Sequence, residues 1–144
     1  IKDINDNLYD NLITFQKKIN KKILLTSFNN SFDYFKNLKS KLNTNKNRNI
    51  ILLENSPLNI MERMIYYSLF AISCHSGFLV QISGTNNSKV IDIINKKDFI
   101  WYSCWVPKNT FHKFVFKSND KKSFELKKIL FDVYKKIENQ KITK

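Results

Sequence analysis

The stretch from Gly77 to Phe114, GFLVQISGTNNSKVIDIINKKDFIWYSCWVPKNTFHKF, decides the fold class that this sequence predicts. Its first part, Leu79 to Ile82, is a short apolar run that ends at the turn residues Ser83-Gly84-Thr85. An apolar run bounded by turn residues is typical of a buried strand. We therefore predict a strand over Leu79 to Ile82, followed by a tight turn.

The second part of the stretch predicts a helix and then another strand. Val90, Ile91 and Ile94 recur at the spacing of one helix face, and the apolar run Phe99 to Tyr102 follows at once. Two strands joined through a helix must lie parallel in one sheet. The sequence therefore predicts an α/β fold, a three-layer α/β/α arrangement around a parallel, Rossmann-like sheet, with an N-terminal helix and a C-terminal helix.

The chain on either side of this stretch adds further elements. Ile23 to Arg48 yields no clear element. The predicted elements are an amphipathic helix over 1–22, a strand over Asn49 to Glu54, a helix that Ser56 caps and Pro57 starts and that ends near His75 to Gly77, a strand over Phe114 to Phe116, and a helix over Asp120 to Lys141.

We divide the chain into three segments. Residues 1–22 form an N-terminal helical extension, residues 23–119 an α/β domain, and residues 120–144 a basic C-terminal helix. The N-terminal helix either packs on its own domain or reaches a neighbouring protein or RNA.

The charge of the chain points to a polyanionic partner. Twenty-five basic residues against 12 acidic residues give a formal net charge of +13 in 144 residues. Nucleic acid and an anionic membrane surface are the candidate partners. No apolar run approaches the roughly 20 residues that a membrane-spanning helix needs, so we expect no membrane insertion.

Several residues of the central stretch carry a resemblance to a known family. They are Gly77, Gly84-Thr85, Trp105, Val106-Pro107, Thr110 and Phe114. In this order they resemble the universal S-two family, the second protein of the small ribosomal subunit. The family pattern is a Gly, a strand ending in Val-Gly-Thr, a helix, a strand that runs into a Trp, a Gly-rich turn and Leu-Thr-Asn-Phe. Here Lys108-Asn109 replace a single Gly of the turn, and Phe111, His112 and Lys113 stand at the Leu-Thr-Asn positions.

The resemblance covers the amino-terminal half of the family, from about Ile23 to the end. It implies a structural protein that binds the ribosomal RNA of the small subunit and neighbouring ribosomal proteins, with no catalysis and no cofactor. A sheet that stops after three strands leaves an unpaired edge, so we expect a second chain or ribosomal neighbours to complete it.

Lysines are the candidate contacts to ribosomal RNA, because each can neutralise one phosphate. The candidates lie before the first strand and around the turn after Trp105: Lys36, Lys39, Lys41, Lys46, Lys108, Lys113 and Lys117. Phe28, Phe32, Tyr34 and Phe35 interleave with the first group and either stack on exposed nucleotides or lie in the core.

The composition and the first residues of the chain predict its cellular location. Ile, Lys, Asn, Phe and Tyr are abundant, which indicates an AT-rich genome. The start IKDINDNLYD is acidic and lacks the Arg-rich character of a transit peptide. With the resemblance, this favours synthesis inside an organelle and a place in the mitochondrial ribosome; a presequence already removed would leave the same pattern.

Catalytic patterns are weak. His75, His112, Cys74 and Cys104 lack metal-ligand spacing, and we predict that the chain is not an enzyme. Gly84 to Asn87 could hold a phosphate but lacks the further glycines of a dinucleotide loop. Two alternatives stay open: a degenerate nucleotide-binding domain, and an accessory subunit of an organellar membrane complex.

Overall fold

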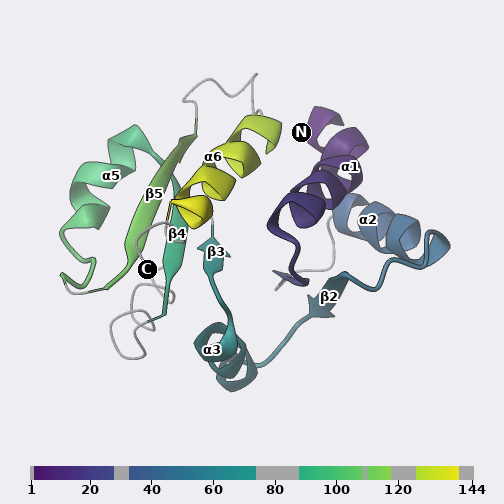
Figure 1. Ribbon diagram of the computed structural model, residues 1–144, viewed down its shortest axis with the longest axis horizontal. Coiled ribbons are helices and arrows are strands. Elements are labelled where there is room, and N and C mark those ends of the chain that lie inside the picture. Colours follow the sequence, from purple (N-terminus) through teal and green to yellow (C-terminus); the bar gives the residue numbers. More distant parts are fainter. Residues whose placement is uncertain (1, 28–32, 74–87, 109, 118–125, 140–144) are drawn as a thin grey trace. The chain divides into compact units, whose positions relative to one another are not determined.

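The computed structural model describes residues 2–27, 33–73, 88–108, 110–117 and 126–139. These residues form two compact units, Ile1–Pro57 and Leu58–Lys144 (Figure 1). The predicted α/β segment 23–119 spans both units, and its limits at 22/23 and 119/120 stay a prediction.

Unit 1 is a helix followed by a strand-helix-strand element. Helix α1 (Lys2–Ile19) leads into β1 (Ile23–Ser27), and α2 (Asp33–Thr44) connects β1 to β2 (Ile50–Glu54). The two strands pair in parallel, with Ile23 opposite Ile50 and Ser27 opposite Glu54. A parallel pair cannot be closed by a hairpin turn, which is why the chain between the strands forms a helix.

The core of unit 1 joins both helices to the sheet. Leu12 of α1, Leu38 and Leu42 of α2, and Ile50 of β2 form one buried cluster. The N-terminal helix therefore packs on its own unit, which is one of the two alternatives that the sequence left open. Alternate strand residues point the other way, and Leu24 and Ile51 remain 46% and 39% exposed.

Unit 2 is a three-stranded parallel sheet with helices before, between and after its strands. The elements are α3 (Leu58–Tyr67), β3 (Ala71–Ser73), β4 (Val90–Asn95), α5 (Lys96–Ser103), β5 (His112–Lys117) and α6 (Leu126–Glu138). The strand order is β3-β4-β5, so β4 lies in the centre.

Strand β4 is covered on both faces. Val90, Ile91, Ile93 and Ile94 are each at most 5% exposed. Ile94 packs with Tyr102 of α5, whereas α6 contacts β4 and β5 from the opposite side (Figure 1). Unit 2 is therefore a three-layer arrangement, and the predicted α/β fold with parallel strands is confirmed.

Several predicted elements are confirmed with shifted ends. The helix over 1–22 is α1, the strand over Asn49 to Glu54 is β2, and the strand over Phe114 to Phe116 lies within β5. The C-terminal helix is α6. The segment without a predicted element contains β1 and α2.

Two predictions in the central stretch are wrong. The predicted helix around Val90 to Ile94 is strand β4, and the predicted strand Phe99 to Tyr102 lies in helix α5. The run VIDII is short enough to fit either period, and burial on both faces of a central parallel strand decides for the strand. Phe99 and Tyr102 stand three residues apart, so a helix directs both rings onto the sheet.

A third prediction is wrong at its end. Helix α3 stops at Tyr67, well before the predicted end near His75 to Gly77. Ser68 ends it, because both the amide and the hydroxyl of Ser68 donate to the carbonyl of Ile65 at 3.1 and 2.8 Å. The predicted strand Leu79 to Ile82 and the turn after it lie outside the described residues. Its predicted partner, Phe99 to Tyr102, is helical, so that segment is not a strand of the sheet.

The central place of β4 predicts unequal costs for two matched substitutions. Ile91 of β4 and Ile72 of β3 are opposite each other in the sheet, yet Ile91 is 0% exposed and Ile72 is 38% exposed. Ile91→Ala should lower the free energy of unfolding by about 2–5 kcal/mol, and Ile72→Ala by clearly less. Urea unfolding followed by tryptophan fluorescence measures this, because both tryptophans lie in unit 2. Equal losses would contradict a β4 buried on both faces.

Candidate functional site

The structure places the predicted RNA-binding lysines in two sets, one in each unit. Lys36, Lys39 and Lys41 lie on α2, and Lys46 lies in the turn that follows. Lys108 follows α5, and Lys113 and Lys117 lie on β5. Every one of these lysines whose burial is described is exposed.

Two of these lysines interact with neighbouring side chains through their ammonium groups. Lys39 Nζ lies 2.8 Å from a Glu54 carboxylate oxygen, an ion pair between α2 and β2. Lys113 Nζ lies 5.5 Å from the centre of the Phe111 ring, within the range of a cation–π contact. Lys39 is half exposed, so its ion pair contributes at most about 1 kcal/mol.

A shallow pocket adjoins the Lys39–Glu54 pair. Its volume is about 290 Å³, and its lining is Lys39, Leu42, Asn43, Asn47, Ile50, Leu52 and Glu54. One cation and one anion that already pair with each other leave little net charge to hold a ligand, so we assign the pocket no chemistry.

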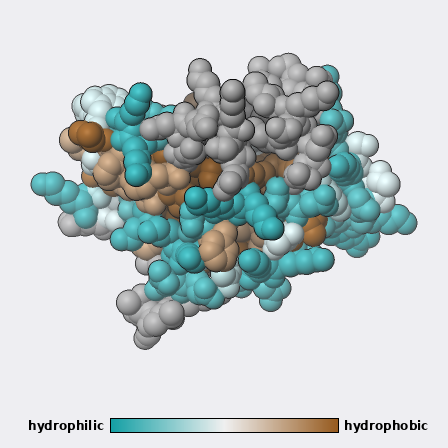
Figure 2. All heavy atoms as spheres, turned by 90° about the horizontal axis from the view of Figure 1, so that it is seen from above, coloured by the Kyte–Doolittle hydropathy of each residue, from teal (hydrophilic) through white to brown (hydrophobic). Residues whose placement is uncertain are grey.

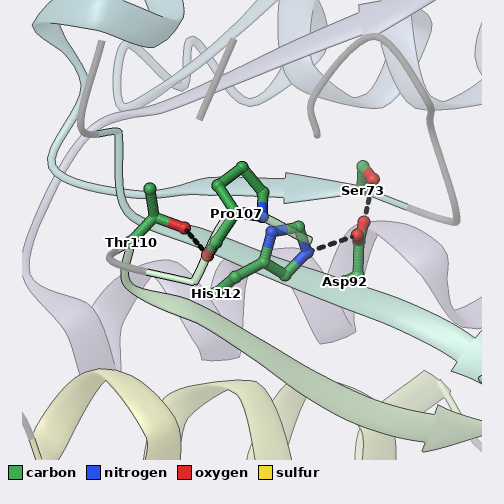
Figure 3. Close-up of polar contacts among 5 residues, drawn as sticks. All are labelled: Ser73, Asp92, Pro107, Thr110 and His112. Atoms are coloured by element: carbon green, nitrogen blue, oxygen red, sulfur yellow. Dashed lines mark hydrogen bonds and ion pairs between the residues drawn. The ribbon is translucent and has the colours of Figure 1, made fainter. Parts of the chain in front are cut away.

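A connected set of polar side chains lies inside unit 2. Figure 3 shows the Asp92 carboxylate between the side chains of Ser73 and His112. The Ser73 hydroxyl donates to Oδ1 of Asp92 at 2.5 Å, and Nε2 of His112 lies 2.7 Å from Oδ2. The side chains of Asp92 and His112 are 0% exposed. We call Ser73, Asp92, His112 and Tyr102 the Asp92 cluster.

Tyr102 of α5 completes the Asp92 cluster. Its side chain is buried and its hydroxyl forms a hydrogen bond with Asp92. Burial raises the pKa of the Tyr102 phenol well above its ordinary value, and the charge of Asp92 and this hydrogen bond raise it further. The phenol is therefore a donor to Asp92 throughout the neutral range.

The turn before β5 positions His112. The Thr110 hydroxyl donates to the carbonyl of Pro107 at 2.9 Å (Figure 3). The His112 amide donates to the carbonyl of Thr110 at 3.0 Å. The His112 ring stacks on Phe114 with centroids 5.1 Å apart. A carboxylate only accepts, so Nε2 of His112 carries a proton and donates a hydrogen bond to Asp92. Among the described residues, Nδ1 of His112 has no partner.

The Asp92 cluster lacks the order that nucleophilic catalysis needs. In a catalytic triad the histidine stands between the nucleophile and the carboxylate. Here Asp92 stands between Ser73 and His112, so the imidazole does not accept the serine proton. The buried side chains of Asp92 and His112 also leave no surface for a substrate. The arrangement satisfies a buried charge and ties three strands and one helix together.

Sequence reasoning missed Asp92. In the sequence analysis His112 was named only as a residue without metal-ligand spacing and as part of the turn that resembles the family, and Asp92 was given no role. A single carboxylate inside the apolar run VIDII is nevertheless a signal of its own. A buried carboxylate needs donors from neighbouring elements. Such donors could have been expected from adjacent strands.

Metal-binding groups and membrane-spanning helices were sought among the residues that the structure describes. Among the described residues, no group of three histidine, cysteine or acidic side chains could hold a metal ion. Cys74, His75 and the loop Gly84 to Asn87 lie outside those residues. No helix in the described ranges is both long and apolar enough to cross a bilayer.

Comparisons with known proteins give no relative from which a role could be transferred. The chain matches no protein-family model, no curated protein and no solved structure.

The Asp92 cluster predicts a graded loss of stability. Asp92→Ala removes the acceptor of three buried donors and should lower the free energy of unfolding by about 3–5 kcal/mol. Ser73→Ala removes one donor and should cost about 0.5–1.5 kcal/mol. Urea unfolding of both variants measures the difference. If Asp92→Ala costs no more than Ser73→Ala, the carboxylate is not the centre of the network.

The raised pKa of Tyr102 predicts an alkaline effect. The unfolded phenol ionises near pH 10, whereas the folded phenol keeps its proton to higher pH. The stabilising contribution is therefore complete below about pH 10 and is lost as the pH rises toward the folded-state pKa. The difference between the absorbance titrations of the wild type and Tyr102→Phe at the phenolate band isolates this group. An ordinary midpoint in that difference would contradict a buried Tyr102 phenol beside Asp92.

Proposed function

We propose that this chain is a structural, non-catalytic RNA-binding protein of the mitochondrial small ribosomal subunit. The observation that carries the proposal is the distribution of charge. The net charge is +13, and every lysine whose burial is described is exposed except the half-buried Lys89.

One acidic residue contributes less to the surface than the formal count implies, because Asp92 lies in the core of unit 2. The ion pair of Glu54 with Lys39 neutralises one charge of each sign and leaves the balance unchanged. The outer surface is therefore slightly more cationic than a simple count of charges suggests. Such a surface attracts the phosphates of RNA, and each contact releases counterions.

The basic residues gather at places that suit phosphate contacts. Lys17 and Lys18 end α1 and Lys21 and Lys22 follow, all four exposed. On α2 and the turn after it, Lys36, Lys41 and Lys46 are exposed as well. Exposed lysines like these can each contact a phosphate without any rearrangement of core residues.

The assignment to a ribosome depends on the resemblance described above. Trp105, Val106-Pro107 and Thr110 form a turn that the Thr110 hydroxyl closes onto Pro107, and Phe114 follows on β5. The family has a strand before the tryptophan, whereas here α5 precedes it. The resemblance therefore supports the proposal through the turn and not through the crossover before it.

The proposal includes protein neighbours as well as RNA. The face of β1 and β2 opposite the helices exposes Leu24 and Ile51, and among the described residues neither strand has a partner on its outer edge. A neighbouring chain that covers this face would bury both side chains. A second chain that completes the sheet is therefore part of the proposal, as is a location in the mitochondrial matrix.

The salt dependence of RNA binding tests the proposal. Replacing Lys36, Lys41 and Lys46 by Gln together should reduce the slope of log K against log salt by about 0.7–0.9 for each lost phosphate contact. Lys39→Gln is the matched control on the same helix, because Lys39 already pairs with Glu54 and should change the slope less. Fluorescence anisotropy of a labelled RNA fragment measures both slopes.

Sedimentation of the chain with organellar particles distinguishes a ribosomal role from other RNA-binding roles. The chain should travel with the small ribosomal subunit at low salt and leave it at high salt. Binding to RNA with a normal salt slope but no association with that subunit would overturn the ribosomal part alone. No RNA binding at low salt would overturn the whole proposal.

A further inference from the structure

Helix α5 and the turn after it expose both tryptophans of the chain. Trp101 is 63% exposed and Trp105 is 65% exposed. Their rings lie 6.0 Å apart at an interplanar angle of 54°. The amides of Cys104 and Trp105 donate to the carbonyls of Trp101 and Tyr102, so the helical turn continues through Trp105.

The orientation of α5 is fixed by its other side. Phe99 packs edge-on against Phe114 and Phe116 at 4.9 and 5.1 Å, and Tyr102 lies in the core. The helix cannot turn its tryptophans inward without removing these contacts. Trp is usually largely buried. Two neighbouring exposed tryptophans therefore indicate a surface that binds a ligand.

Cations flank the two rings. Lys97 stands four residues before Trp101, and Trp101 stands four residues before Trp105, so the three lie along one side of the helix. Lys97 and, after the turn, Lys108 are exposed. Asp98 is the acidic residue of this segment, and the Asn95 side-chain amide donates to it at 3.3 Å. On the face that Figure 2 draws, hydrophobic residues lie at the surface among hydrophilic ones.

We infer that Trp101 and Trp105 bind unpaired RNA bases by stacking, with Lys97 and Lys108 at the flanking phosphates. This inference rests on the proposed RNA-binding function and names the part of the RNA that the surface takes. Single-stranded nucleic acid is bound by aromatic rings along a cationic track. Protein interfaces, in contrast, are depleted in lysine, so the lysines beside these rings favour RNA over a protein partner.

The tryptophan fluorescence of the chain reports on RNA binding at this surface, because the chain contains two tryptophans and both belong to the proposed stacking platform, Trp101 and Trp105. The full chain is titrated with an oligouridylate of about ten nucleotides, with an abasic strand of the same length, and with a duplex. We expect the oligouridylate to quench tryptophan emission, and the abasic strand and the duplex to bind more weakly and with little quenching.

Substitutions separate stacking from simple apolar contact. Trp101→Leu keeps an apolar side chain but removes the ring, and should weaken oligouridylate binding at least about fivefold. Trp101→Phe keeps a ring and should bind nearly as the wild type does. Ile100→Ala removes the neighbouring apolar side chain, which is 77% exposed, and should bind unchanged. The salt slope should stay the same in all three variants.

Each other outcome overturns the inference. If the abasic strand binds as tightly as the oligouridylate without quenching, the chain binds RNA through phosphates alone and the proposed function stands without this platform. If Ile100→Ala weakens binding as much as Trp101→Leu, the surface makes apolar contacts of another kind. If no strand binds at low salt, the proposed function fails and the platform with it.

Discussion

The buried Asp92 carboxylate is the constraint on which unit 2 depends. It lies in the central strand, where water does not reach it, so its hydrogen bonds must come from the protein. Ser73 supplies one from β3, His112 one from β5 and Tyr102 one from α5. A slip of β4 by one residue would turn Asp92 toward the apolar side chains of α6 and leave all three donors without their acceptor. One side chain thus specifies the alignment of three strands and the position of a helix.

This internal network determines what α5 presents outside. Tyr102 holds the helix by its bond to Asp92, and Phe99 holds it by ring contacts with β5. With one side of the helix fixed in this way, Trp101 and Trp105 remain on the surface beside exposed lysines. One side of α5 thus contacts the buried polar network, and the other side presents the tryptophans and lysines to solvent. In unit 1 the exposed lysines lie instead on and beside helices that pack over β1 and β2.

The sequence predicted the amphipathic helices α1 and α6, the parallel α/β class and strands β2 and β5, because their periodic patterns are clear, but it missed β1 and α2. It failed at VIDIINKKDFIWYS, where apolar spacing fits two periods and where tertiary contacts decide. Aromatic residues favour a strand by local preference, yet Phe99 and Tyr102 reach the sheet from a helix. The lysines could be named from composition alone. Their pairing, as in Lys39 with Glu54, and the exposure of the tryptophans could not, because both depend on which elements become neighbours.

The parallel pairing of β1 with β2 has a consequence during synthesis. Ile23 pairs with Ile50, and α2 lies between the two strands in the chain. During synthesis β1 therefore has no partner strand until β2 has been made. Non-local strand pairs form late, and an unpaired strand edge favours aggregation in the meantime. The order of elements in unit 1 thus makes its first strand the part most open to wrong pairing before synthesis is complete.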